Sequence, residues 1–178
     1  MEQQIINYLT RSTYEQFEYI KISDNILDIV YHLLINNKDL IKEEIIIQNP
    51  TLCYYYGIYH QVRHNGKLLK RYYKKATEYG ISEAMDELGY YYCEHNKLNK
   101  MKTYYLMAIE KGNKSAMYHL GCYYCSINDY ESMINYFMMA INYGDIKSMY
   151  AMGTYYEMIN NYELMKKIEP PLHYYFTK

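Results

Sequence analysis

The stretch from Ala84 to Gly112 reads AMDELGYYYCEHNKLNKMKTYYLMAIEKG, and its pattern returns along the chain. Starting at Ala116, 32 residues further on, the chain reads AMYHLGCYYCSINDYESMINYFMMAINYG. Small residues keep this step of 32 at three offsets. They are Gly57, Gly89, Gly121 and Gly153; Gly80, Gly112 and Gly144; and Ala76, Ala108 and Ala140. A fixed period of about 20–50 residues is the signature of a repeat architecture.

Each period contains two helical segments, because apolar residues recur at spacings of three and four rather than two. In the unit that starts at Ala116, we expect the first helix over 115–126 and the second over 130–143. Asn113 and Asp145 are placed to cap first helices, and Asp129 and Asn161 to cap second helices. Two helices joined by a short turn form a hairpin, and a single hairpin cannot bury its apolar face alone.

The sequence therefore predicts an all-α fold, an α-solenoid of stacked antiparallel helix hairpins with a 32-residue period. We divide the chain into a helical cap or degenerate repeat (1–50), four repeats and a C-terminal tail (169–178). The repeats span 52–83, 84–115, 116–147 and a partial unit, 148–168. Glycine within a helix costs about 1 kcal/mol relative to alanine, so Gly89 and its equivalents predict close helix approach.

Composition narrows the function classes. The chain has 178 residues, 50% of them hydrophobic, and a net charge of −1, so no overall field attracts nucleic acid or an anionic membrane. The first residues lack a signal peptide pattern, and no stretch reaches the roughly 18 apolar residues of a membrane span. We expect a protein that is not secreted and that lies in the cytoplasm. The bias to Tyr, Ile, Asn and Lys also fits an AT-rich genome.

The repeat resembles known families at specific residues. Leu88-Gly89, Tyr92, Tyr105 and Ala108 have the offsets of a tetratricopeptide hairpin. The pattern Ala-x-x-x-Leu-Gly-x-Tyr-Tyr, followed by Tyr-Tyr-x-x-Ala-x-x-x-Gly, more closely resembles the Sel-1-like repeat. It covers about 52–168, although the common Sel-1-like unit is longer. The compact, Met- and Tyr-rich form looks like the version in giant DNA viruses of amoebae, which implies a viral protein in the host cytoplasm.

Two clusters have the residue types of metal or catalytic sites. His119, Cys122 and Cys125 follow one another along a first helix, and His60-x-x-x-His64 has a spacing used by metal sites. Neither has an evident further ligand, so we interpret them as structural residues and expect no cofactor, no metal and no enzyme. The alternative is a metal-binding or hydrolytic protein that uses the Cys/His cluster.

A basic run lies on the second helix of the first repeat, and tyrosines recur throughout. Arg63, Lys67, Lys70, Arg71, Lys74 and Lys75 form the run. We interpret it as a solvated helix face, with contact to an acidic partner or RNA as the alternative. Most tyrosines keep fixed offsets, which is typical of core positions rather than of a base-stacking platform.

Variable offsets on the first helices are free to contact a partner. By analogy with tetratricopeptide proteins, they predict a binding groove. Its candidate residues are Tyr54, Tyr55, Ile58, Asp86, Glu87, Tyr90, Cys93, Tyr118, His119, Cys122, Cys125, Tyr150 and Thr154. Because tyrosine suits protein contacts, we expect a monomeric or weakly self-associating adaptor or scaffold that binds a protein or peptide. A self-associating structural viral protein is the second alternative.

Overall fold

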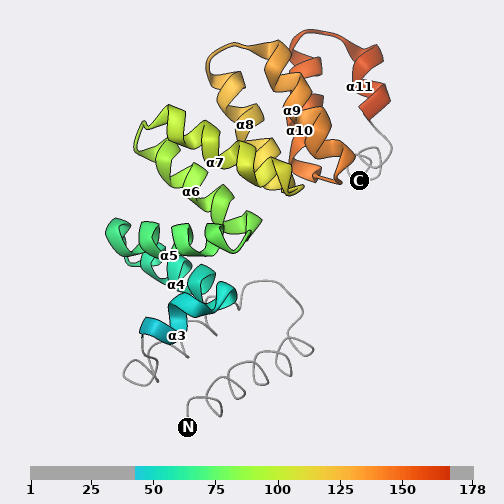
Figure 1. Cartoon of the computed structure of the whole chain (residues 1–178). Coiled ribbons are helices and arrows are strands. Elements are labelled where there is room, and N and C mark those ends of the chain that lie inside the picture. Colours follow the sequence, from blue (N-terminus) through green and yellow to red (C-terminus); the bar gives the residue numbers. More distant parts are fainter. Residues whose placement is uncertain (1–42, 169–178) are drawn as a thin grey trace. The chain divides into compact units, whose positions relative to one another are not determined.

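The computed structural model describes residues 43–168 and shows helices joined by short turns, with no strand in that range (Figure 1). The predicted all-α fold of consecutive helix hairpins is confirmed. The chain forms two compact units, 1–72 and 73–178, whose boundary falls within one helix. The helical pieces predicted before residue 43 and the tail 169–178 lie outside the described residues.

The helices follow the sequence period. First helices of the hairpins are α4 (Pro50–Val62), α6 (Ser82–Glu94), α8 (Lys114–Ser126) and α10 (Ile146–Met158). Second helices are α5 (Gly66–Glu78), α7 (Leu98–Glu110), α9 (Tyr130–Asn142) and α11 (Tyr162–Ile168). Each series starts at intervals of 32 residues, and the expected bounds for α8 and α9 differ by one residue at one end. The isoleucine-rich segment before Asn49 is helical, as α3 (Glu43–Gln48).

Side-chain caps start the helices where the sequence predicts them. Asn113 and Asp145 accept hydrogen bonds from the backbone N–H groups of Ala116 and Ser148 at 3.0 and 2.7 Å. Asp129 and Asn161 do the same for α9 and α11. Ile81 and Lys97 stand at the equivalent places before α6 and α7 and make no such bond. Two of the central helices therefore start without a side-chain cap.

Left-handed residues end the helices. Gly80, Gly112 and Gly144 have φ values of 75–83° directly after the second helices, as a C-terminal cap requires. The turns after the first helices use a non-glycine residue with φ of 52–58° at every repeat. These residues are His64, Asn96, Asn128 and Asn160. Asparagine tolerates this conformation better than most side chains, and it recurs here with the same step of 32.

The mid-helix glycines allow close packing in two hairpins. A Cβ atom on Gly89 would lie 2.4 Å from Cδ1 of Tyr105, and one on Gly121 would lie 2.5 Å from Cδ1 of Phe137. The ring of the second helix therefore occupies the space that the glycine leaves. Among residues 43–168, a Cβ atom on Gly153 would meet nothing within 4 Å. Ala76, Ala108 and Ala140, which sequence reasoning placed at this contact, are fully buried in the same core.

A second contact, between stacked rings, also joins the two helices of a hairpin. Tyr92 stacks on Tyr104 with ring centroids 5.4 Å apart, and Tyr124 stacks on Tyr136 at 5.4 Å. In the first hairpin, His60 takes the tyrosine's place and stacks on Tyr72 at 5.5 Å with an interplanar angle of 4°.

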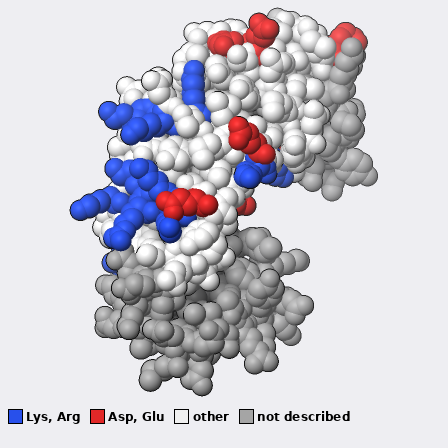
Figure 2. Space-filling view, in the orientation of Figure 1, with Lys and Arg blue, Asp and Glu red and all other residues white. Residues whose placement is uncertain are grey.

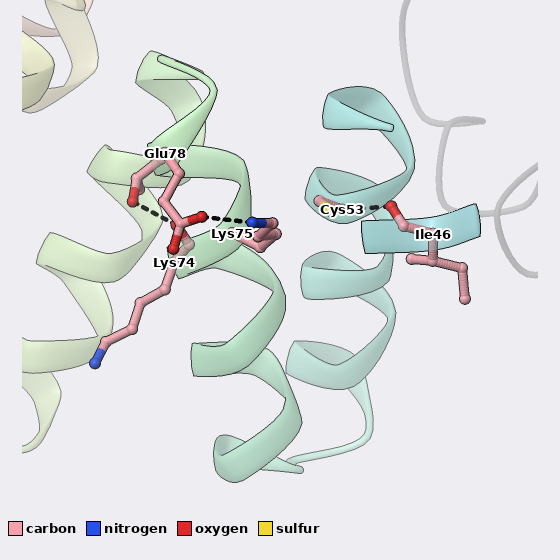
Figure 3. A network of polar contacts seen from close by, with 6 residues as sticks. Ile46, Cys53, Lys74, Lys75 and Glu78 are labelled. Atoms are coloured by element: carbon pink, nitrogen blue, oxygen red, sulfur yellow. Dashed lines mark hydrogen bonds and ion pairs between the residues drawn. The ribbon is translucent and has the colours of Figure 1, made fainter. Parts of the chain in front are cut away.

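Unit 1 contains a contact between α3 and α4. The Cys53 thiol donates a hydrogen bond to the carbonyl oxygen of Ile46 at 3.1 Å (Figure 3). Cys53 is fully buried, so this bond gives its thiol a partner away from water. Over the described residues, no helix combines the length and the hydropathy needed to cross a membrane.

Candidate functional site

The predicted binding residues are distributed over all four first helices. Tyr54, Tyr55 and Ile58 lie half-buried on α4, in unit 1. In unit 2, Tyr90 and Tyr150 are 43% and 42% exposed, and Cys93, Cys125 and Thr154 are also exposed. Glu87, Tyr118, His119 and Cys122 are half-buried. Asp86 is only 8% exposed, so it lies beneath the surface rather than on it.

The structure brings the α6 and α8 residues together through one polar contact. Nδ1 of His119 lies 2.9 Å from Oδ1 of Asp86, although the residues are 33 apart in sequence. A carboxylate accepts hydrogen bonds, so the neutral ring carries its proton on Nδ1 and leaves Nε2 as an acceptor. The His119 side chain is 30% exposed, so this acceptor belongs to a partly solvated ring.

Three tyrosine rings lie close to His119. The centroids of Tyr105, Tyr118 and Tyr90 lie 5.6, 5.6 and 6.1 Å from the imidazole centroid. Tyr105 comes from α7 and is almost fully buried, whereas Tyr90 is an exposed residue of α6. We call the surface formed by Tyr90, Tyr118, His119 and Cys122, with Asp86 beneath it, the α6–α8 face.

Cys122 is a poor nucleophile in this setting. Burial raises the pKa of its thiol, which opposes the formation of the reactive thiolate. Hydrogen bonding with Cys122, followed by burial, raises the pKa of Tyr118. Burial, followed by the Glu94 charge, raises the pKa of Cys93 as well.

The other candidate ligands do not form a joint site among residues 43–168. Within this range, no group of three or more His, Cys, Asp or Glu side chains is arranged to hold a metal ion. His60 and His64 do not share a helical face, because α4 ends at Val62 and His64 forms the left-handed turn after it.

Five of the six residues of the basic run lie on α5, whereas Arg63, predicted on the same helix, is the C-cap of α4 because α4 ends at Val62. Lys67, Arg71 and Lys74 are exposed, and Figure 2 shows basic side chains gathered over this part of the surface. Nζ of Lys75 pairs with Oε2 of Glu78 at 2.6 Å, one turn along the same helix (Figure 3). On its opposite side, α5 buries Leu69, Tyr73 and Ala76. The helix is therefore amphipathic, as the interpretation of a solvated basic face requires.

Sequence reasoning missed two kinds of residue. Tyr72, Tyr104 and Tyr136 form the ring stacks, and their step of 32 was a readable signal. Lys102 of α7 lies 5.0 and 5.2 Å from the ring centroids of Tyr123 and Tyr124 of α8, a cation–π contact between successive hairpins. Lys70 and Lys166 stand at the same offset as Lys102, and only the third unit differs, with Ile134, so this recurrence was also a readable signal.

Comparison with known proteins gives no match: no family model, no curated protein and no solved structure is significantly similar to the chain. Function must therefore be argued from the residues themselves.

Proposed function

We propose that the chain is a non-enzymatic repeat protein that binds another protein or peptide, as an adaptor or scaffold. The resemblance of its repeat to the Sel-1-like repeat supports this role, and the same resemblance supports a viral origin. The observation that carries the proposal is the α6–α8 face. There, residues at variable offsets of two adjacent helices combine exposed aromatic surface with an oriented hydrogen-bond acceptor.

The chemistry of this face suits binding better than catalysis. Aromatic rings supply large contact area at a low cost in side-chain entropy, and they are enriched where binding energy concentrates. The Asp86–His119 contact fixes the imidazole, so a partner meets an ordered acceptor instead of a mobile one. The raised pKa values of Cys122 and Cys93 leave both thiols protonated at neutral pH.

The test compares two double variants of the full chain as baits. Tyr90→Ala with Tyr150→Ala removes exposed rings from first helices, whereas Tyr130→Ala with Tyr143→Ala removes rings of 43% and 58% exposure from α9 and its end. Capture of the same partner by wild type and by the α9 variant, with loss in the first variant, is the expected result. Equal capture by both folded variants would show that the partner does not bind these helices.

A further inference from the structure

The charges of α6 limit which partner the α6–α8 face can accept. This helix contains Glu83, Asp86, Glu87 and Glu94 and no lysine or arginine. Tyr90 and Cys93 lie on the same helix, and Glu94 follows Tyr90 one turn later. Negative charge and exposed aromatic surface therefore occupy one helix.

The α6 carboxylates raise the pKa of two tyrosines. Glu94 raises the pKa of Tyr90, first as a hydrogen-bonding group and then through its negative charge. Burial raises the pKa of Tyr105, and the Asp86 charge is the next cause. Each carboxylate opposes a second negative charge at the neighbouring ring.

The remaining groups of the face also favour a cation. When the uncharged His119 ring directs its Nδ1 proton at Asp86, Nε2 is a hydrogen-bond acceptor. Tyrosine faces attract ammonium and guanidinium groups. The Tyr118 ring already has such a contact, because Nζ of Lys147, from α10, lies 5.9 Å from its centroid and Phe137 stacks on it. Tyr90 is the exposed ring of the face.

We propose that the α6–α8 face binds a basic peptide segment, with an arginine side chain placed against the exposed Tyr90 ring and hydrogen-bonded to Nε2 of His119. Glu87 and Glu94 attract this segment from the rim. The inference rests on the proposed function, because it names the chemistry of the partner for the same face.

A direct binding measurement tests the charge preference. The probe is a fluorescein-labelled peptide of repeated Gly-Ser-Arg triplets, compared with peptides in which Gln or Glu replaces Arg. We expect the arginine peptide to bind the full chain most tightly, with affinity that falls as salt is added. In nuclear magnetic resonance spectra, the amide signals of Tyr90, His119 and Cys122 should shift on binding.

Charge-matched variants separate this face from bulk attraction. The double variant Glu87→Gln with Glu94→Gln should bind the arginine peptide with an affinity roughly three- to tenfold lower than that of wild type. Glu110→Gln with Glu131→Gln removes two exposed carboxylates from α7 and α9 and should leave affinity unchanged. Equal weakening in both variants, or signal shifts confined to other helices, would overturn the proposed site.

The outcomes also distinguish this inference from the proposed function. If the glutamine peptide binds the α6–α8 face as tightly as the arginine peptide, the basic-partner inference fails and peptide binding by the face stands. If the tyrosine variants capture the natural partner as well as wild type does, the proposed function fails at this face whatever the peptides show.

Discussion

Gly89 and Gly153 occupy the same position in their hairpins but have different neighbours. The Tyr105 ring fills the space beside Gly89, whereas no atom of the described residues fills the corresponding space at Gly153. Glycine therefore allows close packing at position 89, whereas at position 153 it only lowers the stability of its helix. Gly121 behaves like Gly89, with Phe137 as its ring.

Replacing these glycines by alanine should change stability in opposite directions. Gly89→Ala should lower the free energy of unfolding by about 1–3 kcal/mol, because the buried ring must move. Gly153→Ala should raise it by about 0.5–1 kcal/mol, since alanine favours the helix and meets no atom. Urea titration of the full chain measures both. A loss of stability in Gly153→Ala would contradict the assignment of open space there.

His60 differs from its equivalents, Tyr92, Tyr124 and Tyr156, in that it can be protonated. Its Nδ1 atom is buried, and no described residue forms a hydrogen bond with it. Burial, followed by the Arg63 charge, lowers the pKa of this imidazole. The unfolded chain therefore takes up the proton more readily than the folded one.

His60→Tyr should stabilise the first hairpin and remove part of its pH dependence. In wild type, the stability that depends on a neutral His60 is present above its ordinary pKa of 6.5 and is lost as pH falls below that value. Thermal unfolding at pH 7.5 and pH 5.5 checks this, with His95→Tyr at an exposed site as the control. A wild-type-like pH dependence in His60→Tyr would refute the role of His60.

At the scale of elements, the helices were predictable and the contacts between them were less so. Repeated apolar spacing, cap residues such as Asn113, and glycines such as Gly112 determine where a helix begins and ends from local sequence alone. The Asp86–His119 contact depends on how two hairpins stack, and the residues involved do not recur in other repeats. Local pattern therefore predicts the helices, and the geometry of the candidate face requires coordinates.

The missing caps give a prediction about α7. Lys97 precedes this helix at the place where Asp129 precedes α9. Lys97→Asp should raise the free energy of unfolding by about 0.5–2 kcal/mol, because its carboxylate can accept from an unpaired N–H group of the first turn. Asn113→Ala should lower the free energy of unfolding by about 1 kcal/mol, because it removes the cap of α8. Chemical denaturation compares both with wild type, and Lys97→Gln controls for loss of the lysine charge alone.

At the scale of the whole molecule, the helices of unit 2 pack mainly against their hairpin partners, and successive hairpins contact one another less extensively. Unit 2 shows this along its length, with contacts of α7 to α8 and of α9 to α10. Repeat arrays of this kind have stabilities that sum local terms and nearest-neighbour terms. The last helix described, α11, has seven residues and packs on α10. The free energy of local unfolding should therefore be lower for α11 than for the central hairpins.

Amide hydrogen exchange should show this gradient. We expect amides of α11 to exchange faster than those of α8 and α9, because fewer packed residues hold them. Asn161→Ala removes the α11 cap and should speed exchange in α11 alone. Uniform exchange rates through unit 2, or an Asn161→Ala effect that reaches α6, would show that the unit opens as a single cooperative body.

The step of 32 residues has a consequence for how such a chain can change length. The Gly89–Tyr105 contact and the Gly121–Phe137 contact use the same offsets within consecutive hairpins. A genetic crossover between any two points that are one period apart would insert or delete one whole hairpin. The new neighbours would then meet through the same kind of interface that joins hairpins in the present chain. The number of hairpins can therefore change during evolution without the need for a new type of interface between them.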